Sequence, residues 1–443
     1  MKLDNFRFKK RTIESWNNTI KNSAIVVYPR NTMELRKLIK FLKENNKKYL
    51  IRTGSCSYDS KSINPDLDTI VISLSLFNKI LSLNNKKRYV EVEAGALISD
   101  VIKKIKKKNV TLFSVPGGEK VSIGGAISAN TIGKDSTSKV SSFGDAVTSL
   151  ETISTDGKIQ KISNKKKLSK FVGAFGMEGI ILKAKLKLKK MKSQNLLVKT
   201  KILKNLSEVM SEFKEKSEYH YVQLDPFFRP DTFGISFKAN SIDQQNNYYK
   251  SINLKTLNIE KIIFKFFGNF INNVSWRIFY KLFFLFNAKV NKIIDVHNFH
   301  YSSKYKHLIP QSCKDGLIDY EILIKKNFYA EMNNLINILK KNKIYPMYVI
   351  IKKIFKSKNN YCYQFNQNGF AVAISINKSK VKNENLDEFK NYLFKKKYKI
   401  NLSKTDEKFI EIKKNGSNLF LSLYKEKLLK QYGISGTRIR SFR

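Results

Sequence analysis

The sequence predicts an α+β protein of two domains, and three observations carry this prediction. Twelve of the 19 glycines fall between Gly54 and Gly179, so the first half of the chain is rich in tight loops. After Lys190 the glycines thin out, and alternating or helical apolar patterns take over. With 443 residues, 42% of them hydrophobic, the chain is long enough for two domains with cores of their own. We therefore expect one domain over residues 1–193 and a second from residue 194 onwards.

The glycines of the first half gather at three places, residues 52–59, 116–134 and 173–179. Glycine loses more backbone entropy on folding than other residues, so dense clusters mark loops that need a positive φ or a close approach to a ligand. Consecutive exposed backbone N–H groups form a concavity that binds anions, which holds a diphosphate with few cations. The first half is therefore predicted to bind a dinucleotide cofactor.

The spacing of these glycines disfavours the commoner nucleotide-binding folds. The sequence has no GxGxxG motif that follows a strand and opens a helix near the start, and it has no GxxxxGK[ST] motif. Gly173, Gly176 and Gly179 are spaced like a weak variant, but the residues after them alternate as in a strand. Rossmann and P-loop domains are therefore not expected.

The order of segments over residues 24–191 resembles the FAD-binding domain shared by vanillyl-alcohol oxidase and p-cresol methylhydroxylase, the PCMH type. The motifs that carry the resemblance are Arg52-Thr-Gly-Ser-Cys-Ser-Tyr58, Val90-Glu-Val-Glu-Ala-Gly95, and the long loop from Pro116-Gly-Gly to Gly124-Gly125. The resemblance implies a two-domain flavoprotein with a PCMH-type FAD-binding domain and an α+β substrate domain over 194–398. It also implies that residues 399–443 return to the FAD domain.

Within that family the chain most resembles the decaprenylphosphoryl-β-D-ribose 2'-oxidases. Their long loop is similar to Val121-Ser-Ile-Gly-Gly-Ala-Ile127 and to Ser142-Phe-Gly144, and a fainter similarity reaches Ile400-Asn-Leu-Ser-Lys404. This branch implies oxidation of a secondary hydroxyl of a sugar-like substrate, the 2'-hydroxyl of a polyprenyl-phosphate-linked pentose, by hydride transfer to flavin N5. A separate short-chain reductase would then complete an epimerisation.

The resemblance also implies which residues hold FAD, and that FAD is bound noncovalently. Cys56 stands where covalent members of the superfamily have a histidine, and we expect it to fill space in the loop. Ser122 and Asn130 are the expected side-chain donors. The expected cofactor-binding residues are Arg52, Thr53, Gly54, Ser55, Cys56, Ser57, Tyr58, Pro116, Gly117, Gly118, Ser122, Gly124, Gly125, Asn130, Gly133, Ser142, Gly179 and Ile181.

By the same resemblance, Lys404 and Lys353 are the expected catalytic residues. A desolvated lysine beside the flavin can stabilise its reduced form or move the hydroxyl proton, and both roles stay open for Lys404. Lys353 is the expected ligand of a phosphate or hydroxyl. Glu321, Ala373 and Asn401 are expected to face the substrate, where the branch has glutamine, cysteine and tyrosine.

Two other functions remain open. An aldonolactone or 2-hydroxyacid oxidase can use the same flavin domain, although aldonolactone oxidases usually end with His-Trp-x-Lys and tryptophan occurs here only at 16 and 276. The third function is a degenerate, non-enzymatic basic protein that serves at a membrane surface or as a scaffold. Ile132, in place of a histidine, and the loss of glycines at Thr53 and Ser55 favour that degenerate protein.

The composition bears on partners. The formal net charge is +48, but only 11 of the 84 basic residues are arginine and no arginine–aromatic cluster occurs, so nucleic acid is not an expected partner. Such a charge favours anionic membranes and phosphate-bearing substrates. The four histidines and three cysteines lack metal-ligand spacing, so no metal site is expected.

Residues 259–294 are rich in aromatic side chains with lysines on the flanks. This pattern fits core helices and equally a segment that lies in the lipid interface. The start of the chain lacks the apolar core of a signal peptide, and no apolar run approaches the roughly 20 residues of a membrane span. The expected location is cytoplasmic, either free or at the cytoplasmic face of the inner membrane.

Overall fold

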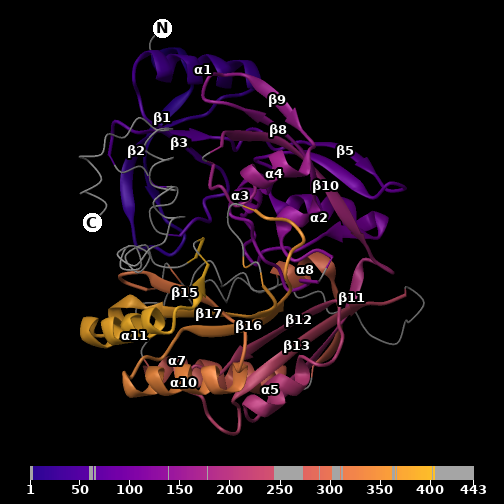
Figure 1. Cartoon of the computed structure of the whole chain (residues 1–443), viewed down its shortest axis with the longest axis vertical. Coiled ribbons are helices and arrows are strands. Elements are labelled where there is room, and N and C mark those ends of the chain that lie inside the picture. Colours follow the sequence, from indigo (N-terminus) through magenta and orange to yellow (C-terminus); the bar gives the residue numbers. More distant parts are fainter. Residues whose placement is uncertain are drawn as a thin grey trace.

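A computed structural model describes residues 3–58, 63, 66–137, 139–176, 178–243, 273–288, 290–301, 310, 313–361, 365, 367–401 and 403–404. Two sheets from the N-terminal half lie at the top of Figure 1, and an eight-stranded sheet from the second half lies below them. This division of mixed helix and sheet confirms the predicted α+β fold of two domains.

The first sheet has four strands in the order β1-β2-β4-β3. Helix α1 begins after Asn31, whose side-chain oxygen accepts a hydrogen bond from the backbone N–H of Glu34 at 2.9 Å. Leu35, Leu38 and Leu42 are fully buried, on one face of the helix and in a core shared with the strands. The elements are β1 Phe8–Glu14, β2 Lys21–Val27, α1 Thr32–Glu44, β3 Tyr49–Arg52 and β4 Ile70–Ser73, preceded by the short 3-10 helix η1 Leu3–Asn5.

The second sheet has the order β5-β6-β10-β8-β9, with β7 also paired to β10. The loop from Pro116 to Ser122 leads into the short helix α3, which contains Gly124 and Gly125 and lies against this sheet. The strands are β5 Ile80–Asn84, β6 Tyr89–Glu93, β7 Val110–Leu112, β8 Val147–Ile153, β9 Ile159–Ile162 and β10 Ile180–Lys190. The helices are α2 Ile98–Ile105, η3 Lys106–Lys108, α3 Ile123–Ser128, η4 Phe143–Ala146 and α4 Lys165–Phe171.

The third sheet has eight antiparallel strands in the order β14-β11-β13-β12-β16-β17-β15-β18. Helices α5, α10 and α11 cover one face, and Figure 1 shows them below the sheet, away from the N-terminal domain. The strands are β11 Asn195–Leu203, β12 Tyr219–Leu224, β13 Gly234–Ser241, β14 Asn291–Asp295, β15 Leu317–Ile324, β16 Tyr348–Ile354, β17 Gly369–Asn377 and β18 Lys399–Ile400. The helices are α5 Leu206–Glu212, α7 Asn273–Asn287, α8 Val296–Tyr301, α10 Phe328–Lys341, η7 Lys378–Lys380 and α11 Asn383–Lys395.

Side chains alternate between the two faces of this sheet. Ile322, Val349 and Ile351 belong to the core beneath α5, α10 and α11, whereas Glu321 and Lys352 point to the opposite face. That opposite face is turned toward the loops of the N-terminal domain. The register of each strand therefore decides which of its side chains meet the first domain.

Helix α7 has apolar side chains on two faces. Trp276, Tyr280 and Phe284 recur every four residues and are buried in a common cluster. The side chains of Val274, Ile278, Leu282, Leu285 and Phe286 are exposed. The buried face agrees with the core-helix interpretation of residues 259–294, and residues 259–272 lie outside the described part of the chain.

A polar contact joins the two domains at Asp145. Its Oδ1 accepts hydrogen bonds from the side chains of Ser357 at 2.6 Å, Asn359 at 2.9 Å and Tyr361 at 2.8 Å. Its Oδ2 accepts one from the backbone N–H of Ser141 at 2.8 Å. The loop that follows β16 is thus fixed on η4, which contains Asp145.

The C-terminal segment differs in part from the prediction that residues 399–443 return to the first domain. Strand β18 pairs with β15, so residues 399–400 extend the sheet of the second domain. Residues 401, 403 and 404 follow them along the cavity described below, and residues 405–443 lie outside the described part of the chain.

Candidate active site

A cavity of about 340 Å³ lies between the two domains. Its walls come from the glycine-rich loops of the first domain, the inner face of the eight-stranded sheet, helix α7, and the segment after β18. The glycine loops and the sheet belong to parts of the chain that are distant in sequence, so the cavity exists only in the assembled fold.

The two main glycine loops touch each other through their backbones. A Cβ at Gly54 would lie 1.8 Å from the carbonyl oxygen of Lys120, so only glycine permits this approach. Thr53 Oγ1 and Ser122 Oγ share a hydrogen bond of 2.5 Å across the same contact. Ser55 has a φ of 59°, the left-handed region that favours glycine, at a position where the resembled family has glycine. The geometry of the first loop is thus kept although two of its glycines are replaced.

The loops leave room for a ligand that approaches their backbone. A Cβ at Gly117 would meet no atom within 4 Å, so this glycine borders open space within the cavity wall. Ser122 lies directly before α3, and its Oγ accepts a hydrogen bond of 3.2 Å from the N–H of Gly125. Backbone donors and small side chains are the groups that a dinucleotide diphosphate requires. The residues present therefore fit FAD.

The structure brings most of the predicted cofactor-binding residues to this one cavity. Those that line it are Arg52, Thr53, Gly54, Ser55, Cys56, Ser57, Tyr58, Pro116, Gly117, Gly118, Ser122, Gly124, Gly125, Gly133, Gly179 and Ile181. The guanidinium of Arg52 donates a hydrogen bond of 2.6 Å to the carbonyl oxygen of Glu14. This bond ties the end of β3, where the first loop begins, to the end of β1.

Asn130 and Ser142 are not among the described residues that line the cavity. Asn130 is buried, and its Oδ1 accepts a hydrogen bond from the N–H of Gly144 at 3.1 Å. Ser142 is buried directly before η4. Both residues therefore shape the loop behind the cavity wall, rather than face a ligand as predicted.

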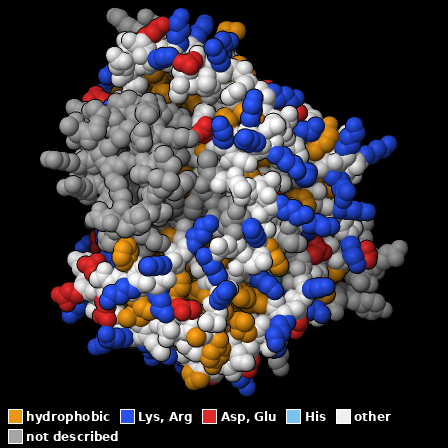
Figure 2. All heavy atoms as spheres, in the orientation of Figure 1, with side chains coloured by type: hydrophobic (Ala, Val, Ile, Leu, Met, Phe, Trp, Pro, Cys, Tyr) orange, Lys and Arg blue, Asp and Glu red, His pale blue; other side chains and the backbone are white. Residues whose placement is uncertain are grey.

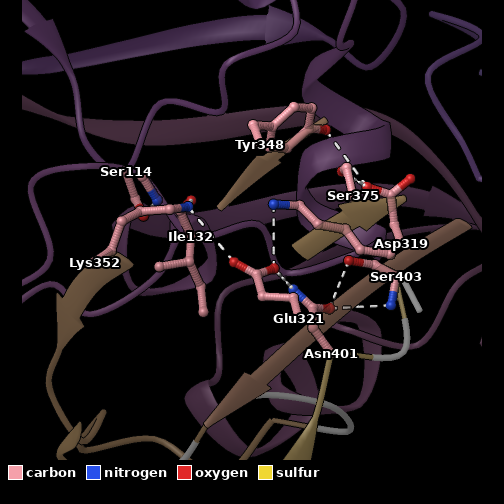
Figure 3. Close-up of polar contacts among 11 residues, drawn as sticks. Ser114, Ile132, Asp319, Glu321, Tyr348, Lys352, Ser375, Asn401 and Ser403 are labelled. Carbon is pink, nitrogen blue, oxygen red and sulfur yellow. Dashed lines mark hydrogen bonds and ion pairs between the residues drawn. The ribbon is translucent and has the colours of Figure 1, made fainter. Parts of the chain in front are cut away.

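On the opposite wall a buried carboxylate holds two lysines. Glu321 on β15 has only 1% of its side chain exposed. Its Oε2 lies 3.1 Å from Lys404 Nζ, and its Oε1 lies 3.6 Å from Lys352 Nζ. Asn401 Nδ2 donates a hydrogen bond of 2.5 Å to Oε2, and Figure 3 shows Glu321 between Lys352 and Asn401. Lys352 also donates to the carbonyl oxygen of Ile132 at 3.3 Å, across the domain interface.

The surroundings of Glu321 keep it ionised. Burial alone would raise the pKa of this carboxyl group, because a charge is poorly solvated inside a protein. The charges of Lys404 and Lys352 and the amide of Asn401 outweigh burial and lower the pKa to about 2. The carboxylate is therefore charged at any pH at which the protein is handled.

The structure corrects the prediction for Lys353. This residue is exposed on the other face of β16, where its Nζ lies 3.4 Å from the carbonyl oxygen of Phe213. Its neighbour Lys352 is the one that lines the cavity. Because side chains alternate along a strand, an error of one residue in the alignment transfers the side chain to the opposite face.

The other predicted substrate-facing residues, Ala373 and Asn401, line the cavity together with Glu321 and Lys404. Ala373 lies directly opposite Glu321 in the register of β15 and β17. A small side chain there leaves the space in front of the carboxylate open.

Sequence reasoning missed a second polar cluster beside Glu321. Asp319 lies two residues earlier on the same face of β15, and its Oδ1 accepts hydrogen bonds from Ser375 and, at 3.4 Å, from Tyr348 (Figure 3). Burial raises the pKa of Tyr348 and of Tyr58 well above the usual tyrosine value, so both phenols stay neutral. The alternation of Asp319 and Glu321 was the signal in the sequence that this strand carries two carboxylates to one face.

Helix α7 gives the cavity an apolar wall. Trp276, Phe279, Tyr280 and Phe283 line it, and Met347 at the start of β16 lies among them. The cavity thus has an apolar side on α7, a polar floor at Glu321 and a backbone-rich side on the glycine loops. This division suits an amphiphilic ligand next to a dinucleotide cofactor.

Cys56 has the chemistry of a structural thiol. Burial raises its pKa to about 12, so the thiol is protonated at neutral pH. Its Sγ lies 3.5 Å from the carbonyl oxygen of Gly54, within the same loop. In the described part of the chain, no group of three or more histidine, cysteine and acidic residues is placed to hold a metal ion.

Residues 23–163 match the family described as FAD binding domain. The chain is 26% identical over 163 residues to decaprenylphosphoryl-beta-D-ribose oxidase of Mycolicibacterium smegmatis, and 25% identical over 219 residues to L-gulonolactone oxidase of Mus musculus. These alignments cover 36% and 48% of the chain and 35% and 48% of the relatives, so the chain spans about a third to a half of their length.

Among solved structures, the chain is similar to cholesterol oxidase from B. sterolicum, with a TM-score of 0.72. That similarity covers 90% of this chain and 87% of the other, at 11% sequence identity. It therefore supports the fold of both domains and says nothing about substrate.

Proposed function

We propose that this chain, whose residues 23–163 match the FAD binding domain family, is an FAD-dependent oxidoreductase that oxidises a secondary hydroxyl. The observation that carries the proposal is the single cavity in which the glycine loops face the polar floor of Glu321, Lys352 and Lys404. When bound, FAD supplies the hydride acceptor. The glycine loops would hold its diphosphate through backbone N–H groups.

The residues of this chain would then position the substrate and manage charge. The ammonium group of Lys404, with a third of its side chain exposed, lies at the cavity surface and is placed to donate a hydrogen bond to the reacting hydroxyl. Lys352, with 11% of its side chain exposed, adds a second positive charge behind it. Helix α7 and the closely packed loops would exclude water from the rest of the site.

The proposed substrate is a polyprenyl-phosphate-linked pentose, oxidised at its 2'-hydroxyl. The similarity to decaprenylphosphoryl-beta-D-ribose oxidase supports a sugar attached to a lipid phosphate. The aromatic wall formed by Trp276, Phe279 and Phe283 would give the apolar chain of this substrate a surface next to the polar floor. In this proposal a separate short-chain reductase reduces the keto-sugar, so that the two steps together invert one carbon.

Noncovalent binding of FAD belongs to the same proposal. A thiol whose pKa is raised to about 12 is a poor nucleophile, so Cys56 is a poor site for a covalent link.

Peripheral association with an anionic membrane extends the proposal. The exposed apolar residues of α7 lie on the helix that also lines the cavity, and basic residues are spread over the visible face in Figure 2. None of the helices in the described part of the chain combines the length and apolar character that a membrane span requires. Sedimentation with phosphatidylglycerol vesicles, compared with phosphatidylcholine vesicles, tests the association.

An oxidase of aldonolactones or 2-hydroxyacids is the second candidate. The similarity to L-gulonolactone oxidase extends over 219 residues, a longer stretch than the similarity to the ribose oxidase. The aromatic wall of α7 does not distinguish a lactone from a lipid-linked sugar by itself. The experiment below distinguishes them by the substrate that bleaches the flavin.

The visible spectrum of the purified protein, before and after anaerobic addition of a polyprenyl-phosphoryl ribose, tests the function. Flavin absorption that bleaches on addition is the expected result. Lys404→Ala should keep the flavin bands and bleach at least about 100-fold more slowly, because it removes a charged donor from the reacting group. Lys341→Ala, at an exposed ion pair with Glu388, is the control.

Flavin bands that bleach only with L-gulonolactone would move the function to the second candidate. A colourless protein that does not take up FAD would overturn the proposal as a whole and leave the degenerate, non-enzymatic alternative.

A further inference from the structure

The proposed function leaves the buried carboxylate of Glu321 without a role of its own. We propose that Glu321 is a positioning residue that holds Lys352 and Lys404 side by side, both charged, so that Lys404 acts as a hydrogen-bond donor and not as the base. The role of Lys404 in oxidation rests on the proposed function, whereas the contacts of Glu321 with the two lysines are independent of it.

Glu321 holds the lysines with two different oxygens. Lys404 Nζ is 3.1 Å from Oε2 and Lys352 Nζ is 3.6 Å from Oε1. The lysines come from different segments, β16 and the residues after β18, so neither position follows from the other. Both ammonium groups therefore lie beside the same carboxylate.

The segment that carries Lys404 is built onto the same residue. The N–H of Asn401 donates to the carbonyl oxygen of Glu321 at 2.7 Å, and its side-chain amide donates to Oε2 at 2.5 Å. Asn401 in turn accepts hydrogen bonds from Ser403, from its N–H at 3.0 Å and its Oγ at 2.7 Å, and from the N–H of Lys404 at 3.1 Å. Glu321 thus determines both the path of this turn and the direction of its lysine.

The ionisable groups of this region come from several elements. Lys352 on β16, Lys404 after β18 and Asp319 on β15 line the same cavity as Glu321, and Arg52 and Lys134 line it from the first domain. Tyr348 and Tyr58 face the same region as neutral phenols. Removal of the Glu321 charge would take away the carboxylate that offsets the two ammonium groups beside it.

A charged Lys404 determines where the protons and electrons go. In the proposed oxidation the alcohol would lose a hydride, with both electrons, to FAD, which supplies the acceptor when bound, and its hydroxyl proton would go to the solvent that reaches Lys404, a third of whose side chain is exposed. Both lysines keep their protons throughout, and their positive charge offsets the negative charge that the hydride brings into the site.

Competitive acetylation with acetic anhydride, followed by mass spectrometry of the peptides, tests the inference on the purified full-length protein after incubation with FAD. The measurement compares the reactivity of Lys352 and Lys404 across a pH series in the wild type and in Glu321→Gln. Glutamine has the same shape, so the bond from Asn401 is kept while the charge is lost. We expect at least one of the two lysines to become about tenfold more reactive at a fixed pH, which corresponds to about 1.4 kcal/mol for the loss of one nearby charge.

Glu388→Gln is the matched control, because it neutralises a carboxylate paired with an exposed lysine on the surface. It should leave the reactivity of Lys352 and Lys404 unchanged. A thermal unfolding curve checks that Glu321→Gln is folded, and Asp319→Asn removes a nearby charge if it is not. Unchanged reactivity of both lysines in folded Glu321→Gln would overturn the inference.

The absorption spectrum of the same samples separates the inference from the proposed function. A colourless protein with shifted lysine reactivity overturns the function and keeps the arrangement of charges. A yellow protein that oxidises its substrate, with lysine reactivity unaltered by Glu321→Gln, keeps the function and overturns the inference. The pH dependence of bleaching in Glu321→Gln adds a second readout that a merely structural role would not change.

Discussion

The two sides of the cavity are built in different ways. On the side of the first domain, the loops around Gly54 and Gly117 present mostly backbone, and their shape depends on the absence of side chains. On the side of the eight-stranded sheet, Glu321 and Lys352 present charged side chains from the middle of strands. One side is thus determined by residue type, and the other by strand register.

This difference determines how each side responds to substitution. A glycine loop that packs backbone on backbone fails when any side chain is added. A strand tolerates substitution on its outer face and fails on its inner face. Each side can therefore be tested by substituting two positions of the same loop system or strand that differ only in what their side chains would meet.

The largest effect is expected at Gly54. Gly54→Ala would place a Cβ 1.8 Å from the carbonyl oxygen of Lys120, which forces the two loops apart. We expect loss of FAD binding and a fall of about 3 kcal/mol in the free energy of unfolding. Absorption of the purified protein and urea unfolding measure the two effects.

Gly117→Ala is the matched control, since a Cβ there meets nothing within 4 Å. Its free energy of unfolding should change by less than about 0.5 kcal/mol. If Gly54→Ala retained both FAD and stability, the backbone contact between the loops would not matter as described.

The next effect is expected at β16. Lys352→Met removes a charge from the cavity, whereas Lys353→Met changes the adjacent residue on the outer face. We expect substrate-dependent bleaching of the flavin to slow about 100-fold in the first variant and less than about twofold in the second. Equal effects in the two variants would contradict the register of this strand.

The smallest effect concerns pH and His220, on β12 in the same sheet. Burial, and then the charge of Lys238, lower the pKa of this histidine to about 4. Between pH 6.5 and 4 the unfolded chain binds a proton at this histidine that the folded chain does not. The free energy of unfolding is therefore highest above pH 6.5 and decreases as the pH falls. From pH 6.5 to 5.5 the loss should be about 1 kcal/mol.

His220→Gln removes the titrating group, so the free energy of unfolding should depend less on pH between 6.5 and 5.5. Glutamine can keep the 3.0 Å contact with Ser236. Urea unfolding at pH 7.5, 6.5 and 5.5 measures the slope in both proteins. A slope that is the same in the variant would place the titration on another group.

The sequence predicted the first side of the cavity better than the second. Gly54, Gly117, Gly118, Gly124 and Gly125 could be read directly, because residue type alone reveals a need for close backbone approach. Asn130 and Ser142 are not among the residues that line the cavity, because Asn130 binds the N–H of Gly144 and Ser142 is buried directly before η4.

On the second side the sequence could not determine register. In β16 both faces carry apolar residues, Val349 and Ile351 on one and Ile350 on the other, so alternation did not show which of two adjacent lysines faces inward. The pairing of Glu321 with Lys404 joins residues of distant segments, and only the assembled sheet brings them together. The two-domain α+β architecture followed from glycine distribution and apolar pattern, which are properties of whole segments.

The hydrogen bonds of Asp145 impose an order on biosynthesis. The partners of this carboxylate lie 212 to 216 residues further along the chain, at Ser357, Asn359 and Tyr361. A ribosome that adds about 5–20 residues per second needs at least ten seconds to supply them. Late in that interval the first domain has been synthesised, but the partners of Asp145 and the residue Lys404 of the opposite wall have not. The complete cavity, and with it the final binding site for the cofactor, therefore forms only after nearly the whole chain has been synthesised.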